Sequence, residues 1–369
     1  MTVLVQILGG IVVFQLFFSG YFLLTSRKGS RLSNGLLSAF MWSLGFGLLD
    51  YFMLWYGLFD ENTQFAFLLN SLVILHAPFL LLYTQSLTDV AFRLRPFHLL
   101  HLIPFLLALG LLAKYYYLQP EDIRSMALEA VKDGKNQVSV GVTIAGLLYE
   151  IAYLLAIKLC LNTYRIRIRN EYSNINKINL RWLDYLVNAF LLAYLGSAFS
   201  NISRHVEMQY FEEWPMLLGL LATFTFMNGV LLKGLHNNEI FLGGQRKRNV
   251  VASHGENAIT VDQLKEHLEV KKPFINPNLT LAELADQLNV SARELSGLIN
   301  TKLGQTFFDL INSYRIEEVK KMLISPTSRD KTILELMYEV GFNSKSSFNT
   351  AFKKFTGQTP SQYKENHGV

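Results

Sequence analysis

The sequence predicts an all-α protein: a seven-helix transmembrane bundle, followed by a cytoplasmic all-α domain in which a long helix joins two helix-turn-helix units. Three observations predict this fold. Long uncharged runs fill residues 1–232, charged residues recur every few positions after them, and a helix-turn-helix pattern occurs twice near the C-terminus. Half of the 369 residues are apolar and only 17% are charged, which is unusual for a wholly soluble protein.

Seven apolar runs approach the roughly 20 residues that a helix needs to cross the hydrocarbon core of a bilayer. They are Val3–Leu24, Asn34–Phe59, Phe65–Leu87, Pro96–Leu112, Val138–Leu161, Trp182–Ser200 and Trp214–Leu232. The fourth run is the weakest because it is short and contains Pro104. The first run has neither a basic region before it nor a small-residue cleavage site after it, so we expect it to persist as a helix of the mature protein.

Basic residues in the connecting loops predict the orientation of these spans. The loops after the first, third, fifth and seventh runs hold fourteen Lys and Arg residues, and the opposite set holds five. The richest loop follows the fifth run and contains Arg165, Arg167, Arg169, Lys177 and Arg181. Because positively charged loops stay in the cytoplasm, the N-terminus is expected outside and the C-terminus inside.

Ionisable residues within the spans are expected to face the interior of the bundle, because exposure to lipid is costly. They are Asp50, His76, Glu150, Lys158 and Asp184. Two interpretations stay open: Asp50, His76, Glu150 and Asp184 form an intramembrane sensing site, or these side chains make interhelical hydrogen bonds or lie near helix ends, as Lys158 and Asp184 do. His98 and His101 have a metal-compatible spacing, but no Cys, Asp or Glu nearby completes a site, so neither a metal nor a cofactor is predicted.

Residues 233–258 predict a flexible linker with several glycines and the basic cluster Arg246–Arg248. As a random coil they would span about 25 to 30 Å. The sequence thus divides into a membrane domain (1–232), this linker, and a C-terminal domain (259–369).

Helix-start signals are frequent in the C-terminal domain. In each of them a Ser or Thr is followed three residues later by Glu or Gln, the pattern of a capping box that satisfies the free N–H groups of a first helical turn. The pairs are Thr280/Glu283, Ser291/Glu294, Thr332/Glu335 and Thr359/Gln362. A first helix over Val261–Val270 and a long amphipathic helix over Thr306–Ile324 complete the expected all-α domain.

One pattern occurs twice in this domain. Helical residues 281–288, a break at 289–290 and a second helix over 291–303 have the spacing of a helix-turn-helix unit. About 52 residues later the pattern returns as 333–340, a break at 341–342, and 344–355. An internal repeat of this kind predicts two units of the same structure.

The residues of the C-terminal domain resemble those of the AraC/XylS-type transcription regulators, and the resemblance covers essentially all of 259–369. Its most specific part comprises Arg315-Ile316, Ile333, Val340-Gly341-Phe342, Ser346, Phe348, Phe352-Lys353-Lys354, Gly357 and Thr359-Pro360. Two positions depart from the family pattern: Met337 replaces a small Ala, and Ser347 replaces an aromatic residue. Family members mostly carry a soluble ligand-binding domain, so the resemblance implies little about residues 1–232.

The second helix of each unit is expected to enter the major groove of DNA with the residues opposite its core positions. These outward positions match the base-reading positions of the family and are Arg293, Ser296, Gly297 and Asn300 in the first unit, and Lys345, Ser346, Asn349 and Thr350 in the second. Lys353 and Lys354 are expected to bind phosphate. The alternative is that all of these side chains form an ordinary solvated helix face.

From Glu256 onward there are as many basic as acidic residues, fourteen of each, which predicts only modest non-specific attraction to DNA. A homodimer on the DNA would supply further affinity.

The expected function is that of a membrane-bound, sequence-specific DNA-binding regulator that senses a signal in one polypeptide. Its partners would be promoter DNA, the lipid bilayer and RNA polymerase, and its place the bacterial cytoplasmic membrane. The alternative is a membrane transporter or receptor whose C-terminal tail only autoregulates or tethers DNA. No enzyme is predicted, because the sequence lacks HExxH, GxSxG, P-loop and GxGxxG motifs.

Overall fold

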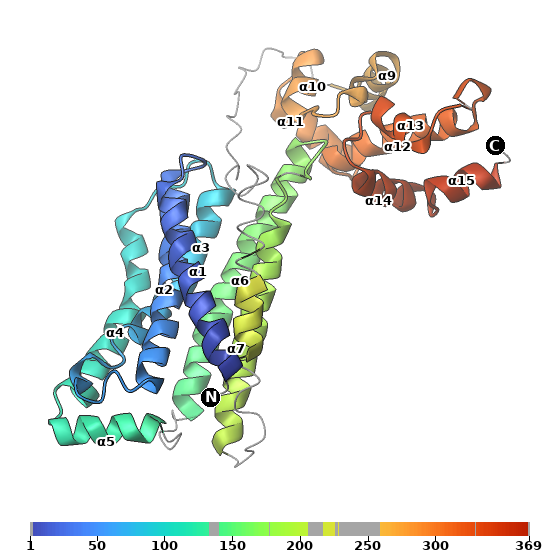
Figure 1. Cartoon of the computed structure of the whole chain (residues 1–369). Coiled ribbons are helices and arrows are strands. Elements are labelled where there is room, and N and C mark those ends of the chain that lie inside the picture. The colour runs from blue at the N-terminus through green and yellow to red at the C-terminus, as the bar shows by residue number, and fades with distance from the viewer. Residues whose placement is uncertain are drawn as a thin grey trace. The chain divides into compact units, whose positions relative to one another are not determined.

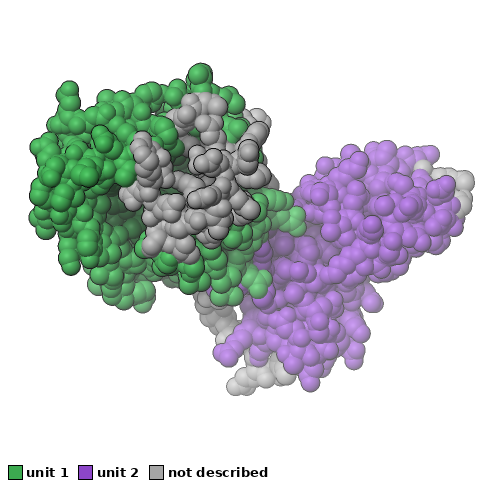
Figure 2. All heavy atoms as spheres, turned by 90° about the horizontal axis from the view of Figure 1, so that it is seen from below, with its two compact units in different colours: residues 1–162, 180–245 green, residues 163–179, 246–369 purple. Residues whose placement is uncertain are grey.

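The computed structural model describes residues 3–132, 140–176, 178–205, 217–225, 228, 259–328 and 330–367. In this part of the chain the secondary structure is helical, and β-pairing is limited to one isolated bridge between Tyr172 and Thr280. The chain divides into two compact units, shown in different colours in Figure 2. Unit 1 comprises residues 1–162 and 180–245, and unit 2 comprises residues 163–179 and 246–369.

The helices of unit 1 follow one another along the chain, from blue to yellow in Figure 1. They are α1 (Val3–Thr25), α2 (Arg31–Trp55), α3 (His76–Thr88), α4 (Ile103–Leu112), α5 (Glu121–Lys132), α6 (Val140–Glu171) and α7 (Arg181–His205). The 3-10 segments η1 (Thr63–Phe65) and η2 (Asn70–Leu75) precede α3, and η3 (Pro96–Leu102) precedes α4. α6 also contributes its last residues, from Thr163 onward, to unit 2.

Five helical segments among the described residues are long and apolar enough to cross a membrane, judged by length and composition. They are Val3–Thr25, Arg31–Trp55, Thr63–Thr88, Pro96–Tyr117 and Gly141–Glu171, and they coincide with the first five predicted spans. The predicted sixth span coincides with helix α7. Residues 217–225 and 228 of the predicted seventh span are described and helical, whereas its other residues and the linker 233–258 lie outside the described residues. The count of seven therefore stays a prediction.

Helix α5 was not predicted, because its residues lie between the fourth and fifth predicted spans, where a loop was expected. It begins with Glu121 and Asp122 and ends with Lys132, a distribution that suits the helix dipole. Its Leu128 is buried in a cluster that also contains Phe59 and Tyr116. Leu128, with Ala127 and Val131 packed against the same cluster, therefore anchors this amphipathic helix to unit 1.

The helices of unit 2 follow the predicted pattern closely. They are α9 (Val261–Lys271), α10 (Leu281–Gln287), α11 (Ala292–Gly297), α12 (Phe307–Ile324), α13 (Ile333–Glu339), α14 (Lys345–Thr356) and α15 (Pro360–Asn366), with a π-helical turn η8 (Leu298–Lys302) after α11. All four predicted capping boxes are formed, at Thr280, Ser291, Thr332 and Thr359. A fifth, at the start of α9, was not predicted.

Helix α12 connects two hydrophobic cores. Phe307, Leu310 and Ile311 in its first half pack with buried residues of α9, α10 and α11. Ile316 and Val319, farther along, pack with buried residues of α13 and α14. Two helix pairs, α10–α11 and α13–α14, are therefore held by opposite halves of one helix.

The turns inside the two pairs have the same hydrogen bonding. Val290 N donates to Ala285 O at 3.0 Å in the first, and Phe342 N donates to Met337 O at 3.0 Å in the second. The preceding residue has a positive φ in both, 54° at Asn289 and 93° at Gly341. Asn and Gly are the residue types that adopt this left-handed conformation most readily. The sequence repeat is thus matched by a repeat of backbone geometry.

Candidate nucleic-acid interface

Helix α11 and the π-helical turn η8 that continues it have one apolar face and one polar face. Leu295 and Ile299, on the apolar face, are fully buried. Of the four predicted DNA-contact residues on this segment, Arg293, Gly297 and Asn300 are exposed and Ser296 is half-buried. The Asn300 amide donates a hydrogen bond to Ser296 Oγ at 3.1 Å, which orients both side chains.

Helix α14 has the same division. Phe348 and Phe352 are buried and pack edge to face, with ring centroids 5.7 Å apart. The predicted DNA-contact residues of this helix, Lys345, Ser346, Asn349, Thr350, Lys353 and Lys354, are all exposed. The exposed face therefore carries three cations and three neutral polar groups, which suits contact with base edges and phosphates.

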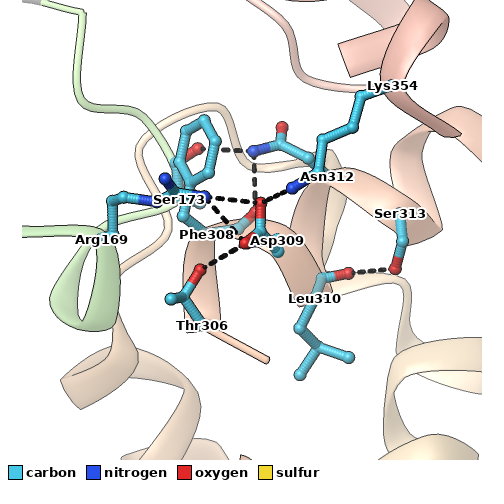
Figure 3. A network of polar contacts seen from close by, with 9 residues as sticks. All are labelled: Arg169, Ser173, Thr306, Phe308, Asp309, Leu310, Asn312, Ser313 and Lys354. Carbon is cyan, nitrogen blue, oxygen red and sulfur yellow. Dashed lines mark hydrogen bonds and ion pairs between the residues drawn. The ribbon is translucent and has the colours of Figure 1, made fainter. Parts of the chain in front are cut away.

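Lys354 has an acidic partner within the protein. Its ammonium group donates to Asp309 Oδ1 at 2.7 Å (Figure 3). Arg169 donates to both oxygens of the same carboxylate, at 3.1 and 2.8 Å. Thr306, the N-cap residue of α12, donates its hydroxyl to Asp309 Oδ2 at 2.9 Å. We name Arg169, Thr306, Asp309 and Lys354 the Asp309 cluster.

Burial raises the pKa of the Asp309 carboxyl, but hydrogen bonds from Lys354 and Thr306 and the charges of Arg169 and Lys354 lower it by more. The pKa of Asp309 in the folded protein therefore lies below its ordinary value. A carboxyl with a depressed pKa stabilises the fold above its unfolded pKa, and this contribution is lost as the pH falls through the folded pKa.

We therefore expect the start of α12 to be equally stable from pH 5 to pH 8 and to weaken below about pH 4, the ordinary range of an aspartate. Hydrogen exchange of the amides around Asp309, corrected for the pH dependence of intrinsic exchange, measures this stability. An Asp309→Asn variant serves as control, because its α12 start should lack the acid-induced step. Equal steps in both proteins would contradict the assignment to Asp309.

Three residues of the interface region were missed from the sequence. Arg169, Ser173 and Asn176 lie in the segment that was predicted to be a loop and whose basic residues were interpreted only as an orientation signal. In unit 2 they contact the C-terminal domain, through Asp309, Leu279 and Ser347, respectively. The high density of arginines was visible in the sequence, but nothing marked Ser173 or Asn176.

The ionisable residues predicted inside unit 1 are not brought together as one site. Asp50, His76 and Glu150 are each at most 2% exposed. His76 Nε2 lies 3.3 Å from Glu150 Oε1, whereas Asp50 accepts a hydrogen bond from Leu69 N at 3.3 Å. Asp184 instead lies 3.7 Å from Lys158. The His76–Glu150 and Lys158–Asp184 pairs, and the hydrogen bond to Asp50, are compatible with interhelical hydrogen bonding. A sensing role for these residues stays a prediction.

Among the residues that the structure describes, no three His, Cys, Asp or Glu side chains gather in a way that could hold a metal ion. His98 and His101 stack with ring centroids 6.4 Å apart, and His101 is hydrogen-bonded to Tyr153.

Comparison with known proteins agrees with the helix-pair geometry. Residues 284–366 match the family described as "Helix-turn-helix domain". An uncharacterized HTH-type transcriptional regulator of Staphylococcus aureus (strain COL) is 29% identical over 161 residues, covering 44% of this chain and 18% of the relative. Another, in the cgkA 5' region of Pseudoalteromonas carrageenovora, is 33% identical over 97 residues, covering 26% of this chain and 55% of the relative.

A solved structure, the C-terminal domain of AraT, a response regulator from Geobacillus stearothermophilus, is 32% identical, with a TM-score of 0.26, and covers 30% of this chain and 88% of that one. The chain spans about a fifth of the length of its Staphylococcus relatives, since 18% of theirs is matched. The C-terminal part of the chain is a helix-turn-helix domain of the AraC type. Both curated relatives are described as HTH-type transcriptional regulators.

Proposed function

We propose that this chain is a membrane-bound transcription regulator that binds specific DNA sequences and senses a signal through its membrane part. The observation that carries the proposal is the repeated helix pair, in which α11 and α14 each bury an apolar face and expose a polar one. In a helix-turn-helix unit, the second helix enters the major groove with such a polar face. We therefore assign α11 and α14 as the recognition helices.

The length of α12 supports simultaneous contact by both units. Its 18 residues extend about 27 Å at 1.5 Å per residue. Successive major-groove segments on one side of a duplex are about 34 Å apart. A spacer of this size suits two units that occupy neighbouring segments of the groove.

Specific binding should depend on Arg293 and Lys345. Arg and Lys donate to the guanine edge in the major groove, and each good contact contributes about 1–3 kcal/mol of discrimination, or roughly 5- to 150-fold in affinity. We expect Arg293→Ala and Lys345→Ala each to lower affinity in this range for a duplex selected from a random pool by the full chain in lipid nanodiscs. Fluorescence anisotropy at fixed salt measures the affinity.

Lys331→Ala is the matched control. Lys331 lies in the same domain and forms an ion pair with Glu339 at 2.8 Å, so its replacement removes a positive charge without removing a recognition side chain. We expect at most a small change in affinity. If Arg293→Ala and Lys345→Ala behave like this control, the two side chains do not read bases.

In the membrane part, the five apolar helical segments support insertion into a bilayer. We propose the N-terminus outside, the C-terminal domain in the cytoplasm, and a homodimer on promoter DNA that contacts RNA polymerase. Asp50, His76, Glu150 and Asp184 are the residues that we propose to respond to the signal. A signal that displaced one partner of a buried pair would leave the other partner unsatisfied, and the bundle would have to rearrange.

A second candidate function is that of a membrane transporter or receptor whose C-terminal domain only autoregulates or tethers DNA. The buried His76–Glu150 pair favours it, because ionisable pairs inside a bundle often mark transport paths. Genome-wide mapping of the intact protein separates the candidates. Many promoter sites support a regulator, whereas occupancy of its own promoter alone supports autoregulation.

A further inference from the structure

Unit 2 contains a segment, residues 163–179, that is separated from the C-terminal domain by about 80 residues in the sequence. We name residues 163–179 the docking segment. It comprises the end of α6 and the turn after it, and it carries four basic residues and one acid. Tyr164 OH donates to Ile178 O at 2.8 Å and Arg165 Nε to Asn179 O at 3.3 Å, so the segment folds back on itself as a hairpin.

Ser173, at the tip of this hairpin, is 1% exposed. Its backbone N and its Oγ both donate to Leu279 O, at 3.1 and 2.7 Å. Its own oxygens accept from the Arg315 guanidinium, the carbonyl at 3.5 Å and the hydroxyl at 3.3 Å. Because buried polar groups are costly when unpaired, a buried serine with this many partners indicates a formed interface.

Arg169 provides a second contact, with the Asp309 cluster, and its guanidinium also lies over the Phe308 ring, 5.6 Å from the centroid (Figure 3). A hydrogen bond between an arginine and a carboxylate is strengthened by the two charges, and here the Asp309 side chain is only 16% exposed. The same carboxylate binds Lys354 of α14. Docking of Arg169 and the position of Lys354 are therefore linked through one acid.

The third contact is with α14 directly. Ser347 Oγ donates to Asn176 Oδ1 at 2.6 Å. Ser347 lies in the first turn of this helix, between the proposed base-reading residues Ser346 and Asn349 and on the same flank as Lys354, two turns along. The docking segment thus occupies one flank of the proposed second recognition helix.

The segment also reaches the first helix pair. Ile166 and Asn170 line an open hollow of about 510 Å³ together with Asn300, Gln305, Asp309 and Lys354. Asn300 lies in η8, the turn that continues the proposed first recognition helix, and Lys354 belongs to the second. Residues of the docking segment therefore stand between the two proposed DNA-contact surfaces.

We propose that the docking segment and duplex DNA compete for the C-terminal domain, so that the docked state binds DNA more weakly than the undocked state. This inference rests on the proposed function. DNA that contacts α11 and α14 together must pass its backbone over the strip between them, where Ile166 and Asn170 lie. Phosphate must also compete with Asp309 for Lys354, and it meets Asn176 at the first turn of α14.

The segment could instead act as a further phosphate-binding surface, because it is basic. The two cases predict opposite changes in DNA affinity when Arg169 is replaced. Loss of Arg169 strengthens DNA binding if the segment competes with DNA, and it weakens DNA binding if the segment contacts phosphate. Replacement of Arg169 therefore tests the competition itself.

The full chain in nanodiscs is titrated with the selected duplex. We expect Arg169→Gln to lower the Kd roughly 3- to 10-fold, the equivalent of a partly buried charged hydrogen bond. Ser347→Ala and Asn176→Ala should each lower it by a smaller factor, and the double variant should match either single one, because all three remove the same hydrogen bond. Lys331→Gln, which removes an equal charge elsewhere in the domain, should not lower the Kd.

A reversible disulfide that holds the docking segment against α14 should have the opposite effect and weaken DNA binding. In a Cys160→Ser background, oxidation of the Asn176→Cys, Ser347→Cys double variant should join the segment to α14 and raise the Kd, and reductant should restore it. Unchanged or tighter binding in the locked protein overturns the inference, as does weaker binding by Arg169→Gln. If instead wild type and all variants bind unrelated duplexes equally well, it is the proposed function that fails.

Discussion

Replacing Gly341 with alanine is expected to destabilise unit 2 by roughly 2–5 kcal/mol, combining the cost of a left-handed alanine with that of overpacking. Gly341 has a φ of 93°. A Cβ on this residue would lie 2.5 Å from Ile275 O and 2.8 Å from Phe274 O. Both neighbours are backbone atoms of the turn between α9 and α10, so neither can rotate away.

Gly357→Ala separates these two costs. Gly357 also has a positive φ, 75°, but a Cβ there would meet nothing within 4 Å. We expect it to lose only about 1–2 kcal/mol, the cost of the left-handed conformation. Pulse proteolysis of the full chain in urea, detected through a C-terminal tag, gives the midpoint of unfolding for each variant. Equal midpoints for the two variants would mean that the turn moves to accommodate the extra carbon.

The local features of the C-terminal domain could be predicted because each depends on residues only a few positions apart in the sequence. A capping box requires two residues three positions apart, and all four predicted boxes are formed. The core positions Leu295, Ile299, Phe348 and Phe352 follow from helical periodicity, and each is at most 1% exposed. Periodicity decides which face of a helix is buried, so these residues needed no tertiary information.

The Asp309 cluster could not be predicted in this way. Lys354 lies 45 residues from Asp309 and Arg169 lies 140 residues from it. A polar helix face shows that a cation is exposed, but it does not show which distant acid it meets. Lys354 was predicted to bind phosphate, and the structure adds a competing partner. The contacts of the docking segment were missed for the same reason. Its basic residues were already explained by the orientation of the membrane spans, and nothing in the sequence indicated which distant residues they contact.

Gly341 illustrates an intermediate case. The sequence identified a break at residues 341–342 but gave no reason for glycine there rather than asparagine, which occupies the corresponding position in the first pair. The φ of Asn289 is also positive, at 54°. The difference is the close approach of the α9–α10 turn to Gly341, a contact between segments far apart in the sequence.

Arg315→Ala should have an effect of similar size, roughly 3–5 kcal/mol, because removal of one partner from a buried charged network leaves the others unsatisfied. The guanidinium is 1% exposed and donates to Phe274 O at 2.7 Å and to Asn276 O at 2.8 Å. It also lies 5.5 Å from the centroid of the Phe342 ring. Burial lowers the pKa of Arg315 to about 10, so the side chain keeps its charge and all its donors at neutral pH.

The position of Arg315 means that this prediction also tests how the two helix pairs are connected to α12. The two carbonyls belong to the turn before the first helix pair, whereas Phe342 belongs to the second pair, so one side chain ties both pairs to α12. Arg315→Lys keeps the charge but replaces a planar fork with a single ammonium, and we expect an intermediate loss. Lys320→Ala, on the same helix and in an ion pair with Glu317, should cost less than about 1 kcal/mol.

Pulse proteolysis ranks the three variants, and hydrogen exchange locates the loss. If Arg315 ties the pairs together, protection should fall in the α9–α10 turn and in the turn around Phe342 alike. Loss confined to one turn would show that each pair is held by its own core, because the two cores on α12 would then be independent.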